Sequence, residues 1–243
     1  MEFLTRTVFA VPMAGAALLL GVWGNVWTFS LLLGSSIAAS GYEVCSLYNK
    51  RLLSLNINTD EAMNQSNMLV CILLIIMYSA VFAKSVFYLR NFNLILFLFL
   101  VVWATDVSAL LIGKLSKIIK VGVGGPRLLR FISEHKTISG CIGGVCGGTL
   151  VGLLHHAWLN PTKNINQDSF ALFQALKLSV ITSSAAVLGD LLESAFKRSC
   201  QTKDSDVFIK IPGHGGVLDR LDSILCAAPV CAVSHYVSLK FTK

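Results

Sequence analysis

Long uncharged stretches alternate with short polar segments along the 243-residue chain. A helix needs about 20 apolar residues to cross a hydrocarbon core of about 30 Å. The first stretch contains 36 uncharged residues, so it predicts two tight spans that break near Gly21 and Gly24 rather than a cleaved leader, whose apolar part usually has about 7 to 15 residues. We therefore expect about seven membrane-spanning helices, within a range of roughly six to nine. The stretches are Thr7–Tyr42, Ala62–Ala83, Asn91–Gly113, Thr137–Thr162, Ser169–Leu192 and Ser223–Leu239.

The pattern within these stretches favours helices over strands. Backbone polar groups in hydrocarbon must be satisfied internally, which leaves only helices and closed barrels. Runs such as Leu94–Val102 are continuously apolar and lack the alternation of barrel strands. Composition agrees, because 54% of the residues are hydrophobic and only 14% are charged, against about 25% in soluble domains. The sequence predicts an all-α, polytopic helical bundle in the membrane and excludes both a soluble globular protein and a disordered chain.

Glycine and cysteine have structural interpretations here. Six glycines recur at spacings of three or four between Gly140 and Gly152, which is more typical of close helix packing than of a phosphate-binding loop. The seven cysteines include no CxxC pair, and most lie within apolar runs. We interpret them as small apolar side chains rather than as a zinc or redox framework.

Basic residues gather in two connections, 114–136 and 197–220, on either side of a predicted helical hairpin. Both connections therefore lie on one membrane face, and the rule that basic loops remain inside makes that face the cytoplasm. The formal net charge of +7 suits an anionic bilayer surface or a phosphate-bearing substrate.

The segment from Gly189 to Ser223 carries the most chemistry. Its first part places four polar residues at positions i, i+3, i+4 and i+7 of one helix face. Its second part contains a glycine-rich turn and further carboxylates, and a helix beginning near Leu218 would direct its amide groups toward an anion. Aspartates supply the oxygen ligands that Mg²⁺ prefers, and the basic residues supply cations for phosphate. The first group is Asp190, Glu193, Ser194 and Lys197, and the second is Pro212, Gly213, His214, Gly215, Gly216, Asp219, Arg220 and Asp222.

Together these residues resemble the C-terminal signature of the phosphatidate cytidylyltransferase (CDP-diacylglycerol synthase) family. The similar motif reads Ser194-x-x-Lys197-Arg198, then Lys203-Asp204, then Pro212-Gly213-His214-Gly215-Gly216-x-x-Asp219-Arg220-x-Asp222. Upstream, Asp106, Ala109, Gly113 and Lys114 are similar to one family segment, and Ser133, Lys136, Thr137 and Gly140 to another. The chain departs from the pattern at Leu110, Glu134 and Ser139, where Tyr, Pro and Glu are usual, and at Asp206 in a longer loop before Pro212.

The resemblance implies an enzyme that transfers the cytidylyl group of CTP to phosphatidate and releases pyrophosphate. It implies Mg²⁺ as the cofactor, held by Asp190 and Asp219 with Asp222 as a weaker candidate, and it leaves a second metal ion open. Ser194, Lys136, Thr137, Asp204, Gly215 and Gly216 would bind substrate. The residues expected to act on the phosphates during catalysis are Lys197, Arg198, Lys203, His214 and Arg220.

In this interpretation residues 1–243 form a single membrane domain, with N-terminal spans of uncertain role in 1–90 and the catalytic spans and loops in 91–243. The compact length and the lack of an extended soluble N-terminal tail suggest a bacterial inner-membrane form, with its active site facing the cytoplasm. A homodimer is compatible with the resemblance and with the glycine-rich span. A CTP-dependent lipid or polyprenol kinase is the nearest alternative. A small transporter that uses Asp106, Lys177 and Asp190 as a charge relay is an alternative of another class. No nucleic-acid-binding motif is found, so we expect no nucleic-acid partner.

Overall fold

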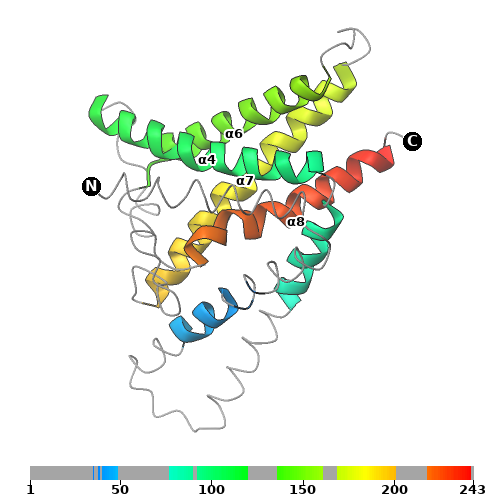
Figure 1. Cartoon of the computed structure of the whole chain (residues 1–243). Coiled ribbons are helices and arrows are strands. Elements are labelled where there is room, and N and C mark those ends of the chain that lie inside the picture. The colour runs from blue at the N-terminus through cyan, green and yellow to red at the C-terminus, as the bar shows by residue number, and fades with distance from the viewer. Residues whose placement is uncertain are drawn as a thin grey trace, which may run out of the picture. The chain divides into compact units, whose positions relative to one another are not determined.

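The computed structural model describes residues 35, 38, 40–48, 77–89, 92–119, 136–160, 169–200 and 218–241. Within these ranges all regular structure is helical and no strand occurs, which confirms the all-α prediction. Two stretches, 40–48 and 77–88, are helical. The predicted breaks near Gly21 and Gly24 lie outside the described residues. The main helices are α4 (Phe92–Ile119), α6 (Ile138–Leu159), α7 (Ser169–Ser199) and α8 (Leu218–Phe241) (Figure 1).

These four helices confirm the last four predicted membrane spans. Among the described residues, four helices are long and apolar enough to cross a membrane. Only 28–33% of the residues in their most apolar windows are buried, so large apolar side chains cover their outer surfaces and face lipid. The protein is therefore a membrane protein, and the count of about seven spans remains approximate.

The helix ends follow local polar chemistry. Thr137 caps α6, its hydroxyl oxygen accepting a 3.0 Å hydrogen bond from the amide of Gly140. At the other end the side chain of Asn160 donates to the carbonyl of His156. The helices α4 and α7 both extend beyond the apolar blocks predicted for them, to Ile119 and Ser199. A helix need not end where the hydrocarbon ends, so these extensions can carry polar residues.

The chain divides into two compact units. One comprises Met1–Arg90 and Phe196–Leu221, and the other comprises Asn91–Ala195 and Asp222–Lys243. The second unit contains α4, α6 and most of α7 and α8, and all the interhelical contacts described below lie inside it. The expectation of a single domain stays a prediction.

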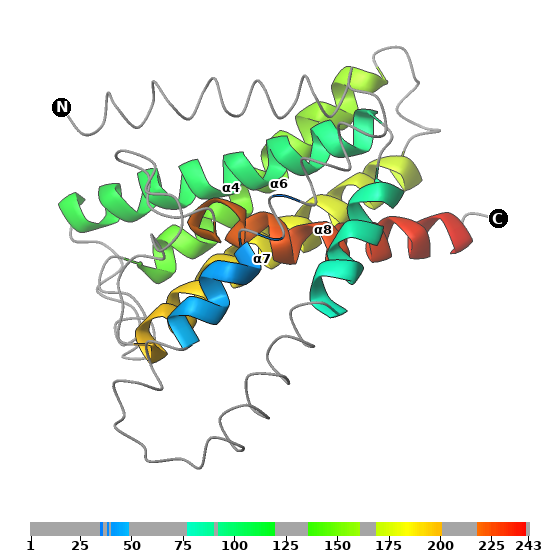
Figure 2. The same cartoon turned by 60° about the horizontal axis from the view of Figure 1, so that its bottom comes forward.

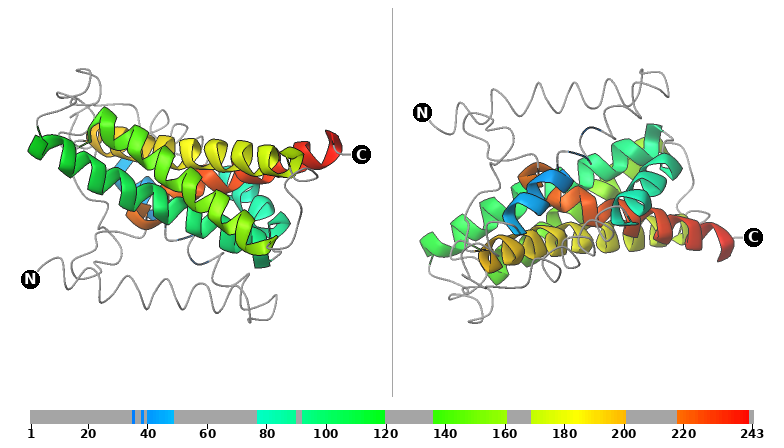
Figure 3. Two further views of the ribbon diagram at one scale, coloured as in Figure 1. Left: turned by 90° about the horizontal axis from the view of Figure 1, so that it is seen from above. Right: turned by 90° about the horizontal axis from the view of Figure 1, so that it is seen from below.

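The glycines of α6 pack directly against α4, so the prediction of close helix packing is confirmed. The two helices run side by side in opposite directions (Figures 1 and 3). A Cβ atom on Gly144 would lie 3.0 Å from both the carbonyl oxygen of Thr105 and the Cβ of Ala109. Gly148 and Gly152 follow Gly144 on the same face of α6, and besides α4 they face the Ser183 and Ser179 hydroxyls of α7. Small residues thus let three backbones approach closely in the membrane.

Polar side chains in this packed region bond back to their own helices. The hydroxyls of Thr105, Ser179 and Ser183 each donate to the carbonyl four residues earlier, at 2.7–2.8 Å. All three side chains are buried. Such bonds satisfy a hydroxyl locally and need no partner on another helix.

A second close contact joins α7 to α8, which run in opposite directions (Figure 2). A Cβ atom on Gly189 would lie 2.6 Å from the carbonyl oxygen of Asp222 and 2.9 Å from the Cβ of Cys226. Gly189 directly precedes Asp190 in the sequence. The absence of a side chain at this position therefore lets α7 and α8 meet beside two of the predicted metal-binding residues.

Candidate active site

Three carboxylates from two helices converge beside the Gly189 contact. α7 supplies Asp190 and Glu193, which lie almost one turn apart on the same face, and α8 supplies Asp222. One oxygen from each carboxylate lies within 4.8 Å of the others. Glu193 is buried, whereas Asp190 and Asp222 are partly exposed. Two of the three predicted metal-binding residues, Asp190 and Asp222, are thus brought together.

Lys136 joins this group from the residue before the Thr137 cap of α6. Its ammonium lies 2.6 Å from an Asp190 carboxylate oxygen and donates to the Asp190 carbonyl at 2.8 Å. It also donates to the Ser194 hydroxyl at 2.9 Å. These contacts can engage all three ammonium protons. The structure therefore places Lys136 and Ser194, both predicted to bind substrate, beside Asp190.

Backbone and hydroxyl groups connect the cluster to α4. The amide of Ser223 donates to Asp222 at 2.7 Å, and the Ser223 hydroxyl donates to an Asp106 carboxylate oxygen at 3.2 Å. Ser139, which stands where the similar family usually has Glu, donates to the Ser116 hydroxyl of α4 at 2.7 Å. The site is thus built from α4, the start of α6, α7 and α8.

The charges of the cluster suit a divalent cation. When ionised, the three carboxylates carry three negative charges, and Lys136 offsets one of them. Carboxylate oxygens are the donors that Mg²⁺ prefers, and their mutual separation in this structure fits ligands of one ion. The donor set thus fits a magnesium ion, with Asp190, Glu193 and Asp222 as its protein ligands.

The other predicted residues lie partly within the described ranges and partly outside them. Thr137 is buried and caps α6, so the structure gives it a structural role, and its role in substrate binding stays a prediction. Lys197 and Arg198 lie in the last turn of α7. Asp219 and Arg220 belong to the first turn of α8, which begins at Leu218 as expected, but their side chains lie outside the described residues. The other residues outside the described ranges are Lys203, Asp204, His214, Gly215 and Gly216.

Glu193 was not among the predicted metal-binding residues, although the sequence contained a signal for it. It lies three residues after Asp190, on the helix face already assigned to the site. Lys136 was predicted to contact substrate phosphate, and its pairing with Asp190, 54 residues away, had no signal in the spacing. Pairing between distant segments depends on tertiary packing, which the local pattern does not reveal.

The fold and the cluster define an integral membrane protein with a candidate cation-binding active site. A model of the cytidylyltransferase family matches residues 50–238, well over half of the chain. The chain therefore belongs to this family, and the resemblance found from the motifs is confirmed.

Curated relatives agree with the family. The chain is 37% identical over 141 residues to a phosphatidate cytidylyltransferase from Staphylococcus saprophyticus, a match that covers 58% of this chain and 48% of the relative. It is 41% identical over 145 residues to one from Brucella abortus, covering 57% of this chain and 45% of the relative. The matches thus span about half the length of these relatives.

Proposed function

We propose that the protein transfers the cytidylyl group of CTP to phosphatidate, giving CDP-diacylglycerol and pyrophosphate. The observation that carries this proposal is the convergence of Asp190, Glu193 and Asp222 with Lys136 in a member of the cytidylyltransferase family. Both relatives described above are named for this reaction.

In the proposed reaction, a phosphate oxygen of phosphatidate attacks the α-phosphorus of CTP. The bond from that phosphorus to the β-phosphate oxygen breaks, and pyrophosphate leaves with the electron pair. A phosphate monoester with a second pKa of about 6 is largely dianionic at neutral pH, so the step needs no general base. The protein's task is to hold two polyanions in line and to offset their charge.

The carboxylate cluster would hold Mg²⁺, with Asp219 as a further candidate ligand one turn before Asp222. Bound there, the ion would neutralise phosphate charge as the pyrophosphate leaves. A second metal ion remains part of the proposal. Lys136 holds Asp190 in place and offsets its charge.

Basic and small residues near the helix ends would bind the phosphates. Lys197 and Arg198 follow the cluster on α7, and Ser194 already lies beside Lys136. We assign pyrophosphate neutralisation to Lys203, His214 and Arg220. Thr137, Asp204, Gly215 and Gly216 complete the substrate-binding set, together with Lys136 and Ser194.

The setting of the reaction is also proposed. CTP is water-soluble and phosphatidate resides in the bilayer, so the site must be reachable from both phases. We place the protein in a bacterial inner membrane with the carboxylates facing the cytoplasm, because in the sequence the basic connections follow and precede the helices at that end. A homodimer is compatible with this arrangement.

The test uses purified full-length protein in detergent with phosphatidate, Mg²⁺ and CTP labelled at the α-phosphorus. The label should appear in CDP-diacylglycerol, and pyrophosphate should be released. Asp190→Asn and Asp222→Asn should each lower the rate by about a hundredfold or more, because each removes a charge placed for the transition state. Lys240→Gln, at the far end of α8, is the control variant and should retain the rate.

Two results would contradict the proposal. Formation of CDP and a newly phosphorylated lipid would identify a kinase that moves the γ-phosphoryl group. Near-normal turnover in both aspartate variants, with melting temperatures like that of the unmodified protein, would remove the carboxylate cluster from the reaction.

A further inference from the structure

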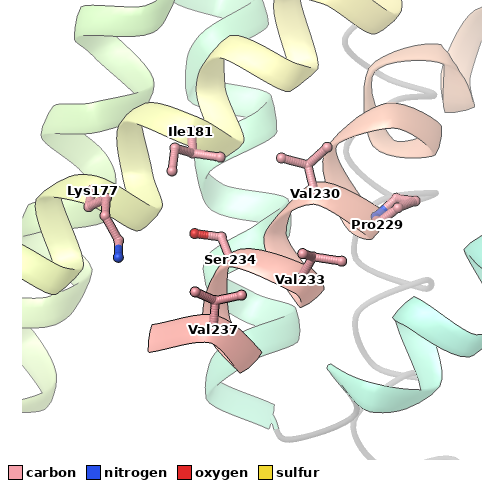
Figure 4. A pocket seen from close by; sticks show the side chains of 7 residues that line it. All are labelled: Lys177, Ile181, Pro229, Val230, Val233, Ser234 and Val237. Carbon is pink, nitrogen blue, oxygen red and sulfur yellow. The ribbon is translucent and has the colours of Figure 1, made fainter. Parts of the chain in front are cut away.

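An apolar groove with a single lysine lies between α7 and α8, away from the carboxylates. Its volume is about 440 Å³, within the range of about 300–1,000 Å³ typical of small-molecule sites. α7 contributes Lys177 and Ile181, and α8 contributes one face that begins at Pro229 and continues through Val233 to Val237 (Figure 4). Apart from Lys177 and Ser234, the lining is apolar.

The groove opens sideways. Val233 is 63% exposed, and Val230 and Val237 are also exposed. In a membrane-spanning helix pair, exposure of this kind means contact with lipid rather than with water. A long apolar chain can therefore enter the groove from the bilayer. A water-soluble metabolite would have to cross hydrocarbon to reach the middle of the groove.

The groove lies toward the membrane face remote from the active site. Lys177 precedes Asp190 by 13 residues, and at 1.5 Å per residue this separation is about 20 Å along the helix axis. Val237 lies one turn before Lys240, whose ammonium stacks over the ring of Tyr236, with 5.1 Å between nitrogen and ring centroid. Aromatic and basic side chains of this kind mark a membrane–water interface. The lysine end of the groove is thus close to headgroup depth.

Lys177 brings a positive charge that no carboxylate in the described part of the chain matches. Among the described residues, the structure shows no ion pair for Lys177. The described carboxylates of the second unit lie toward the opposite end of these helices, at Asp106, Asp190, Glu193 and Asp222. A cation within a membrane span is costly and normally has an anionic partner or reaches the interface. The groove therefore combines a site for an acyl chain with a site for an anion.

We propose that this groove binds a phospholipid with an anionic headgroup, in the leaflet opposite the carboxylate cluster. One acyl chain lies along Ile181, Pro229 and Val233, and the lipid phosphate pairs with the Lys177 ammonium. Basic pockets between membrane helices are suited to anionic headgroups. The site is separate from the proposed cytidylyl-transfer site, and its occupancy does not depend on that reaction.

The test is photolabelling of the full-length protein in phosphatidylcholine nanodiscs. Trace phosphatidylglycerol with a diazirine on one acyl chain is activated, and labelled peptides are mapped by mass spectrometry. Labelling within 229–237 should exceed that by a matched phosphatidylcholine probe roughly fivefold, because one lysine near the surface contributes about 1 kcal/mol toward an anionic lipid. Lys177→Gln should remove the preference, and the matched control Lys240→Gln should retain it.

A second variant tests the contribution of the apolar groove separately from that of the Lys177 charge. Val233→Trp fills the groove from its exposed side, so it should reduce labelling by both probes while Lys177 remains. Melting temperatures establish that each variant is folded. Equal labelling by the two probes in the unmodified protein would overturn the proposal, because the groove would then be a general lipid contact. Loss of labelling on addition of millimolar glycerol phosphate would overturn it as well, since a free phosphate would then be the ligand.

Discussion

The α4–α6 contact and the α7–α8 contact both depend on glycines, yet they treat polar groups in opposite ways. Along α4 and α6, glycines bring the backbones together, and the buried Thr105 hydroxyl bonds to its own helix. At the Gly189 contact, charged groups from separate segments bond to one another across helices. In the glycine-packed part of the first contact, a buried hydroxyl is satisfied within its own helix, whereas the polar contacts of the second exist only when several segments are assembled. A cluster of this kind is costly in a membrane span and points to function.

The largest effect is expected from removing the Lys136 cation, which joins the segment before α6 to α7. Lys136→Met should lower kcat/KM by about a hundredfold, because it leaves the Asp190 charge without its ammonium partner. Lys136→Arg should recover part of the rate if charge is what matters. Cytidylyl transfer by both purified variants is the measurement, with Lys240→Met as the control. An unchanged rate in Lys136→Met would show that the pairing has no part in the reaction.

A smaller effect is expected from Gly189→Ala. Alanine ordinarily stabilises a helix relative to glycine by about 1 kcal/mol, but here its Cβ would meet the Asp222 carbonyl oxygen at 2.6 Å. The two helices must separate, so the rate should fall by about tenfold, since small misplacements at reacting groups are costly.

The matched control for Gly189→Ala is Gly143→Ala in α6. Its new Cβ would meet the Cβ and two further side-chain carbons of Ile112 in α4, so it also forces two helices to shift, but at the α4–α6 contact and not against the Asp222 backbone. Gly143→Ala should keep the rate within about twofold of the unmodified protein. Equal losses in the two variants would mean that the α7–α8 contact has no special relation to the site.

The smallest effect should come from the packed region. Ser183→Ala removes a hydroxyl that bonds to the Ser179 carbonyl of its own helix at 2.8 Å. Its free energy of unfolding should change by less than about 1 kcal/mol, because that carbonyl retains its helical partner. Thermal unfolding in detergent checks the value, and the cytidylyl-transfer rate should not change. A large loss of rate would show that this region participates in the reaction.

Much of the fold could be predicted from the sequence, because a helix that crosses lipid must be long and uncharged and packs closely through small residues. Uncharged length predicted the four spans, and glycine spacing predicted the packing of α6. The spans predicted in Thr7–Tyr42 fall mostly outside the described residues. The ends of α4 and α7 could not be predicted from hydropathy, because both helices continue into polar sequence.

The site was predictable only in part. The i, i+3, i+4 spacing put Asp190 and Ser194 on one helix face, which α7 confirms. The weaker metal candidate, Asp222, reaches the cluster, and the proposal for Asp219 stays a prediction. The approach of Lys136 to Asp190 could not be predicted, because it depends on how α6 packs against α7.

The central claim is that carboxylates of α7 and α8 form one cation site. Mn²⁺ binding to the purified protein, followed by electron paramagnetic resonance, tests it most directly in unmodified protein, Asp190→Asn, Asp222→Asn and the double variant. We predict that each single variant weakens binding by about tenfold or more, and that the double variant is much less affected than the two effects combined, because ligands of one ion act as a unit. Strictly additive effects, or binding unchanged by either substitution, would contradict the claim.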